Sequence, residues 1–173
     1  MAQSLARHLN RVLNLTVSDA RLTVSPVTGD GHDDTFELER VVEGEDVPLE
    51  LYRSTARLSV QQVVVVKDRR CTTKSYEYRY QADESRNSWL MRWDYSRERP
   101  RPVYPYALAH MHIRATLPDE TPIDAHPVDH HHIPCPRTPL EQIIRYLIAD
   151  RGVNSKSKDW EAILKKSEKT FHD

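Results

Sequence analysis

The sequence predicts one α+β domain, with an antiparallel sheet of about six to seven strands, a short N-terminal helix and a C-terminal hairpin of two helices. Apolar and polar residues alternate in short segments through the first two-thirds of the chain, and apolar residues recur at helical spacing at both ends. The 173 residues fit a single domain. We divide it into a strand-rich body (1–116), a loop rich in proline and histidine (117–137) and the helical hairpin (138–173).

The N-terminal helix is expected over residues 4–14. Its apolar residues repeat at helical spacing, and Ser4 is placed to cap it. The strands that follow are expected at 15–24, 36–39 and 47–53, where polar and apolar residues alternate. A central strand is expected at 57–67, which ends in four consecutive valines.

A hairpin of two aromatic strands is expected next. After Lys74 the tyrosines alternate with charged residues, and a second row of large side chains follows a turn-rich segment; the two rows are Tyr76, Tyr78 and Tyr80, then Trp89, Met91, Trp93 and Tyr95. Facing aromatic rows favour cross-strand pairing. We favour a core face for them, the alternative being an exposed platform on which nucleic-acid bases stack.

The last strand is expected at 109–116, before the loop. The C-terminal hairpin then starts with Thr138-Pro139-Leu140-Glu141, which has the form of a capping box with proline at the first helical position. An apolar stripe runs from Leu140 to Ile148 and stops before Gly152. A second helix is expected from near Ser157.

Composition excludes several functional classes. With 4 glycines the chain has no phosphate-cradling loop and no dinucleotide fingerprint, and Gly-x-Ser-x-Gly is absent. No apolar run approaches the roughly 20 residues that span a bilayer, so we expect no membrane contact. The N-terminus does not read as a signal peptide, so we expect a cytoplasmic protein whose Cys71 and Cys135 are not bridged.

Charge is distributed unevenly along the chain. Residues 28–50 hold nine acidic side chains against one arginine, whereas residues 67–114 hold eleven Lys and Arg against six acidic side chains. A chain that is nearly neutral overall can therefore present one basic face to a phosphate backbone. Arginines interleave with aromatics in this region, which predicts an RNA-contacting surface at Trp89, Trp93, Arg97, Arg99 and Arg101.

The His-x-His of the last strand is the main candidate for chemistry. Alternation places His110, His112 and Arg114 on one face of the strand. Imidazoles titrate near neutral pH, so two of them and a cation can provide the base, the acid and the charge stabilisation that RNA cleavage requires. The alternative is a pair of ordinary surface histidines on an edge strand.

A second group of histidines allows a metal site. His126, His130, His131, His132 and Cys135 fall within ten residues, but their spacing matches no closed structural zinc motif. We expect no cofactor. The alternative is a transition-metal site drawn from His110, His112, His130, His132 and Cys135.

Several short motifs also resemble a known family. The segments Tyr76–Gln81, Leu90–Tyr95, Tyr104-Pro105 and His110–Ile113 resemble the TumE-like toxins of toxin–antitoxin systems over about forty residues. The resemblance implies a toxin neutralised by a cognate antitoxin protein, with ribonuclease action as the usual expectation. It matches Arg92, Asp94, His110 and His112; this chain is longer, with an acidic N-terminal region and the helical hairpin.

These observations together predict a toxin-like protein that cleaves RNA with His110 and His112 as acid and base. Arg92 or Arg114 would stabilise the charge on the phosphate, and Asp94 would orient a histidine. The alternatives are a non-catalytic partner or regulator that binds RNA or protein, and a metal-dependent hydrolase built from the histidine clusters.

Overall fold

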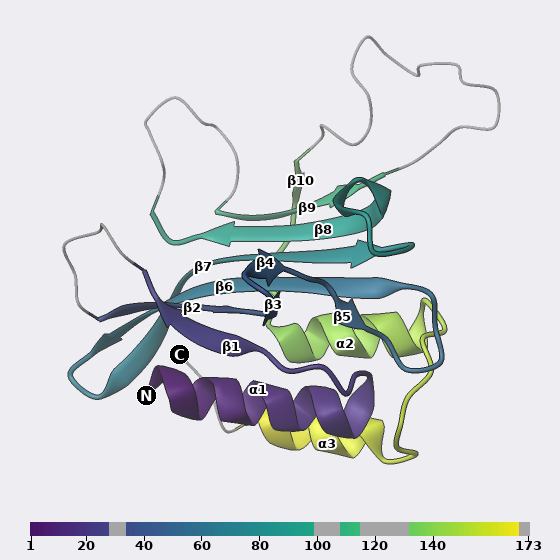
Figure 1. The fold of residues 1–173 in the computed structure, drawn as a ribbon, viewed down its shortest axis with the longest axis horizontal. Coiled ribbons are helices and arrows are strands. Elements are labelled where there is room, and N and C mark those ends of the chain that lie inside the picture. The colour runs from purple at the N-terminus through teal and green to yellow at the C-terminus, as the bar shows by residue number, and fades with distance from the viewer. Residues whose placement is uncertain (28–33, 99–107, 115–131, 170–173) are drawn as a thin grey trace, which may run out of the picture.

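The protein folds as one antiparallel sheet with three helices on one of its faces (Figure 1). The computed structural model describes residues 1–27, 34–98, 108–114 and 132–169, and only the backbone of Arg86. The main sheet has eight strands in the order β1-β2-β6-β7-β8-β9-β10, with β5 paired to β6. The predicted α+β class is confirmed.

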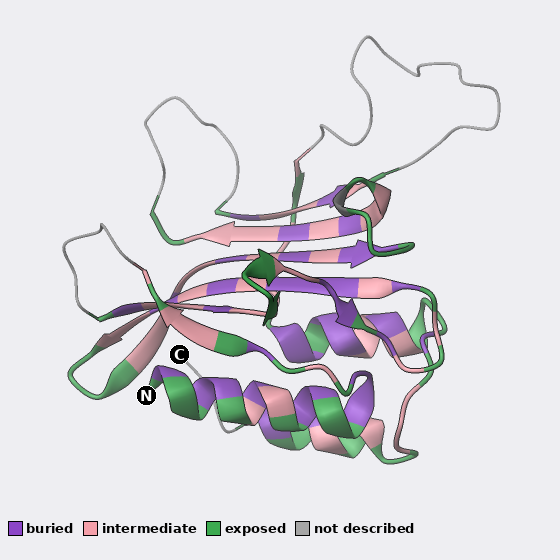
Figure 2. Cartoon of the chain, viewed as in Figure 1, coloured by how far each residue is buried: buried purple, intermediate pink, exposed green. Residues whose placement is uncertain are grey.

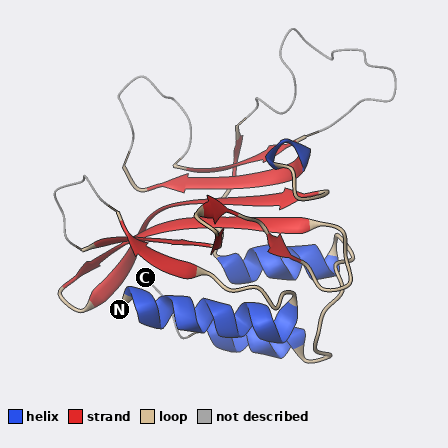
Figure 3. Ribbon diagram, in the orientation of Figure 1, coloured by secondary structure: helices blue, strands red, loops and turns tan. Residues whose placement is uncertain are grey.

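The elements follow the chain as coloured in Figure 3. The strands are β1 (Thr23–Pro26), β2 (Thr35–Glu39), β3 (Val41–Val42), β4 (Glu45–Asp46), β5 (Leu49–Glu50), β6 (Arg57–Lys67), β7 (Arg70–Gln81), β8 (Trp89–Ser96), β9 (Ala109–Ile113) and β10 (Ile133–Pro134). The helices are α1 (Ala2–Thr16), α2 (Leu140–Ala149) and α3 (Trp160–Glu168), and a single 3-10 turn, η1 (Arg86–Ser88), precedes β8. Strands β3 and β4 form a separate two-stranded ladder.

The N-terminal helix α1 is longer than predicted. Its N-cap is Met1, so Ser4 lies inside the helix and does not cap it. The helix also continues through Leu15, which makes the predicted strand at 15–24 wrong except for its last two residues, where β1 begins. The expected apolar positions, among them Leu5, Leu9 and Leu13, are buried.

The longest hairpin, β6 and β7, is the centre of the sheet. Strand β6 has the predicted bounds, and β7 starts four residues before the predicted Lys74. Asp68 and Arg69 connect the strands with φ angles of 49° and 60°. Two consecutive positive φ angles give the turn a twist that matches that of its flanking strands, so the hairpin can close in two residues.

The aromatic rows form the core side of the sheet. Tyr76, Tyr78, Tyr80 and Trp93 are each between 1 % and 7 % exposed. Figure 2 shows the same alternation of buried and half-buried residues along β7 and β8. The core interpretation is therefore confirmed for these four residues and for Met91, whereas Trp89 and Tyr95 are half-buried. The charged residues between the buried aromatics lie on the opposite face of the sheet.

The C-terminal helices begin differently from the prediction. The capping box does not form, because the N-cap of α2 is Pro139 and the N–H of Thr138 donates to the Tyr76 hydroxyl at 2.8 Å. Glu141 instead accepts a 2.6 Å hydrogen bond from Ser167 of α3. The chain does turn at Gly152, with a φ of 69°, and α3 starts three residues after Ser157.

Three further expectations differ in extent. The strand predicted at 47–53 is reduced to β5, and β9 ends at Ile113, while residues 115–116 lie outside the described part of the chain. The expected loop 117–137 contains β10, which pairs with β9. Cys71 and Cys135 are not joined in a disulfide, as predicted. None of the helices in the described ranges is long and apolar enough to cross a membrane.

Candidate active site

The candidate site lies on the face of the sheet opposite the aromatic core. Antiparallel pairing of β8 with β9 places Asp94 across from His110 and Arg92 across from His112. Side chains directly opposite each other on neighbouring strands have Cβ atoms about 4.5–5.5 Å apart. Asp94 and His110 therefore form one cross-strand pair, and Arg92 and His112 form a second pair beside it.

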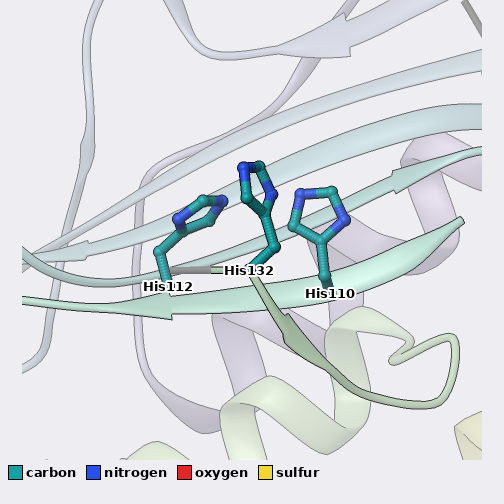
Figure 4. A group of neighbouring side chains, drawn as sticks. All are labelled: His110, His112 and His132. Carbon is teal, nitrogen blue, oxygen red and sulfur yellow. The ribbon is translucent and has the colours of Figure 1, made fainter. Parts of the chain in front are cut away.

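A third histidine completes the cluster from a distant part of the sequence. The pairing of β10 with β9 sets Ile133 opposite Met111, which brings the preceding residue, His132, next to His112. The ring centroid of His132 lies 4.5 Å from that of His112 and 4.6 Å from that of His110. Figure 4 shows the three rings side by side above the strand.

The Asp94 carboxylate joins the two histidines of β9. Its Oδ2 lies 3.2 Å from Nε2 of His112 and 3.5 Å from Nε2 of His110. The same oxygen accepts a 2.9 Å hydrogen bond from Nε of Arg92. One carboxylate oxygen is thus the common partner of two imidazoles and a guanidinium.

Arg92 also contacts His112 directly, with a distance of 3.0 Å from its terminal nitrogen to Nε2. Because a guanidinium only donates, this hydrogen bond requires Nε2 of His112 to accept, and the proton of the neutral ring then sits on Nδ1. A protonated ring would instead donate from Nε2 to Asp94. His112 therefore has a suitable partner in either protonation state.

The cluster is sheltered but not apolar. The side chain of His112 is 3 % exposed, that of His110 16 % and that of Asp94 18 %. Burial lowers the pKa of His132, and the neighbouring His112 and His110 lower it further. The group is therefore shielded from bulk water while it is lined by polar atoms, a condition under which electrostatic interactions are strengthened.

Charged residues of β7 extend these two cross-strand pairs onto a third strand. Glu77 lies opposite Asp94 and contacts Arg79, while Arg79 lies opposite Arg92. Nε of Arg92 is 4.0 Å from Glu77 Oε2. Beyond these carboxylates a hollow of about 260 Å³ continues along the sheet, lined by Glu37, Gln61, Val63, Ser75, Tyr76, Glu77 and Asp94. The carboxylates of Glu77 and Asp94 thus lie at the edge of this hollow.

Basic and aromatic residues border the other side of the cluster. The guanidinium carbons of Arg92 and Arg114 lie 5.8 Å and 5.9 Å from the ring centroid of Trp89. Arg114 is exposed and donates to the backbone carbonyl of Asn87. An anionic group approaching from this side would meet two guanidinium groups before it reached the histidines.

Most of the predicted catalytic residues come together. Asp94 contacts Arg92, His110 and His112, and Arg92 also contacts His112, while Arg114 lies beside Trp89 at the edge of the cluster. Of the predicted metal ligands, His110, His112 and His132 converge. His130 lies outside the described residues.

Two predicted site residues, Trp93 and Cys135, pack against the hydrophobic core. Trp93 is 5 % exposed and packs edge-on against Tyr146 of α2, with ring centroids 5.9 Å apart, so it is a core residue and cannot stack on a base. Cys135 packs against the hydrophobic core, and burial raises the pKa of its thiol. The prediction that placed Trp93 on nucleic acid is therefore wrong. Cys135 is half-buried and is not among the three converging histidine ligands, so its role on a metal stays a prediction.

The predicted nucleic-acid arginines divide into two groups. Arg97 is exposed just beyond β8, at the end away from Trp89, and its Nε donates to the carbonyl of Thr73 at 3.2 Å. Arg99 and Arg101 lie outside the described residues.

Glu77 and Arg79 are site residues that the sequence reasoning missed. Their alternation with the tyrosines already placed them on the face opposite the core, but nothing local indicated that this face also carried the histidines.

Comparison of the chain with protein-family models, with curated proteins and with solved structures gives no match.

Proposed function

We propose that this chain is a toxin-like ribonuclease that acts in the cytoplasm and cleaves phosphodiester bonds of RNA at the cluster of Asp94, His110, His112 and Arg92. The observation that carries the proposal is the shared carboxylate oxygen, 3.2 Å and 3.5 Å from two imidazole nitrogens and 2.9 Å from a guanidinium nitrogen. Cleavage by the neighbouring 2′-hydroxyl needs a base, an acid and a positive charge near the phosphate. The cluster contains all three.

The surroundings suggest how RNA would approach. Arg92 and Arg114 flank Trp89 on the basic side of the cluster, and the carboxylates of Glu77 and Asp94 occupy the other side. A phosphate would be attracted to the arginine side and repelled from the acidic side. This polarity supports entry from the arginine side, with a nucleobase beside Trp89 and the scissile phosphate near Arg92 and the histidines.

The roles divide by what each residue contacts. Of the two imidazoles on β9, His110 is the more exposed and therefore the more accessible to a substrate. One of the two imidazoles takes the proton of the attacking hydroxyl and the other returns a proton to the leaving oxygen. Arg92 stabilises the charge on the phosphate, and Asp94 is a positioning residue that holds both rings.

The toxin assignment is supported by the resemblance of the tyrosine-rich strand, Arg92, Asp94 and the His-x-His to TumE-like toxins. Under this proposal, expression of the chain arrests growth, and a protein partner encoded beside it relieves the arrest. A partner that covers the open face of the sheet would block the site directly.

The experiment compares RNA cleavage by the full chain and by His110→Gln, His112→Gln and Asp94→Asn variants. We expect each histidine variant to lose on the order of 10²-fold or more in rate, since a positioned acid or base contributes about that much. His8→Gln in α1 is the matched control and should keep full activity. Circular dichroism confirms that the variants are folded.

Two results would refute the proposal: unchanged cleavage in His110→Gln and His112→Gln, or no cleavage and no growth arrest by the unaltered chain. RNA that is bound tightly but left intact would favour the alternative of a binding protein. In that case Trp89→Ala should weaken binding while His110→Gln should not.

A further inference from the structure

Three histidines from two separate segments meet at one point of the open face. One ring nitrogen of each of His110, His112 and His132 lies within 4.8 Å of those of the other two. Histidine is the most common protein ligand for transition metals. The convergence requires β10 to pair with β9, because His132 is twenty residues or more from the other two.

The distances around Asp94 fit a metal centre. Two ligands that each lie about 2.0–2.1 Å from a tetrahedral zinc ion are about 3.4 Å apart. Asp94 Oδ2 is 3.2 Å from the nitrogen of His112 and 3.5 Å from that of His110. The carboxylate therefore already lies at the separation of a metal ligand from each of these two rings, whereas the three ring nitrogens, within 4.8 Å of one another, need to move closer together.

We propose that His110, His112 and His132 form a binding site for one divalent transition-metal ion, with Asp94 as the fourth ligand. Three nitrogen donors and one carboxylate oxygen suit Zn²⁺ and related ions, whereas Ca²⁺ and Mg²⁺ prefer sites built from oxygen ligands. The site uses the same side chains as the proposed function, but it can be tested without RNA.

Arg92 occupies the position that competes with the ion. Its guanidinium donates to Asp94 at 2.9 Å and lies 3.0 Å from the His112 nitrogen that would bind the metal. A bound cation must displace this group, and Glu77, 4.0 Å from Arg92 Nε, offers the guanidinium another partner. Arg92 should therefore weaken metal binding through like-charge repulsion.

The test measures binding of Zn²⁺ to tag-free, full-length protein by competition with a chromophoric chelator. We expect one ion per chain with micromolar or tighter affinity. His110→Gln, His112→Gln and His132→Gln should each weaken binding at least about tenfold, and His8→Gln, a histidine outside the site, should not. Zn²⁺ should raise the melting temperature of the unaltered chain and of His8→Gln, but not of the three site variants.

Arg92→Gln gives a second, independent measurement. Removing the competing charge should tighten Zn²⁺ binding by about fivefold or more, because a cation beside the ion is lost while all four ligands remain. No binding at micromolar Zn²⁺, equal binding by His132→Gln, or weaker binding by Arg92→Gln would each overturn the proposed site.

The ion also has a consequence for RNA cleavage. A metal bound to His110 and His112 takes the nitrogen lone pairs that proton transfer needs, so we expect Zn²⁺ to inhibit cleavage and a chelator to restore it. Stimulation by Zn²⁺ would instead overturn the acid–base roles given above and leave the metal site intact. Binding without any cleavage would refute the proposed ribonuclease and not the metal site.

Discussion

The buried hydroxyl of Tyr78 provides a quantitative test of how the strand beneath the site is held. Tyr78 is 1 % exposed, and its hydroxyl donates a 2.9 Å hydrogen bond to the amide oxygen of Gln62 on β6. The amide nitrogen of Gln62 in turn donates to the Thr73 hydroxyl at 3.0 Å. Since Gln62 is itself 7 % exposed, water has little access to replace a lost partner.

Tyr78→Phe removes the donor and leaves the Gln62 carbonyl oxygen without this hydrogen bond. A buried polar group that loses its partner costs about 1–3 kcal/mol, so the free energy of unfolding should fall by about 2 kcal/mol. In a chain of this size that corresponds to a decrease of about 4–8 °C in Tm.

Equilibrium unfolding in urea, followed by circular dichroism, measures the change. Tyr52→Phe, at a half-buried tyrosine in the turn after β5, is the control and should change stability by less than about 0.5 kcal/mol. Gln62→Leu combined with Tyr78→Phe should cost less than the sum of the single changes, because it removes both partners. A Tyr78→Phe variant as stable as the unaltered protein would refute this account of the hydrogen-bond chain.

Other predictions follow from burial. Burial lowers the pKa of His8 below its usual 6.5, although Glu141 opposes the shift and Arg11 adds to it. The unfolded chain then binds a proton at His8 more readily than the folded chain. The free energy of unfolding is therefore at its full value above about pH 6.5 and falls as the pH drops below it. Urea unfolding at several pH values should show a smaller fall for His8→Gln. Trp93→Ala should destabilise the fold by about 3–5 kcal/mol, since it empties a core position. Trp89→Ala should change stability by less than about 1 kcal/mol and weaken RNA binding, as measured by fluorescence anisotropy.

Some of the structure could be read from local patterns. The bounds of β6 were predictable from its run of β-branched residues. The burial of Tyr76, Tyr78 and Tyr80 follows from their period of two, which places alternate side chains on opposite faces. The same rule put His110 and His112 on one side of their strand. The end of α2 near Gly152 was also predictable, because glycine readily adopts a positive φ after a helix.

Errors occurred where a residue had a distant partner that competed with a local one. Glu141 was expected to cap α2, but it accepts a hydrogen bond from Ser167 of α3 instead. Trp93 was expected at a nucleic-acid surface, but the packing of α2 on β8 buries it against Tyr146. In both cases the partner is far away in the sequence, so the spacing of neighbouring residues cannot indicate it.

The histidine site shows the same division. Residue spacing was sufficient to pair His110 with His112, because their relative orientation depends only on the backbone of one strand. The choice of His132 from the histidines of the following loop, and the approach of Asp94 and Arg92, required the register of β8, β9 and β10. That register results from hydrogen bonds and core packing between strands far apart in the chain. It brings His132, Asp94 and Arg92 next to the two imidazoles of β9, and the five side chains together form the candidate centre for catalysis or metal binding.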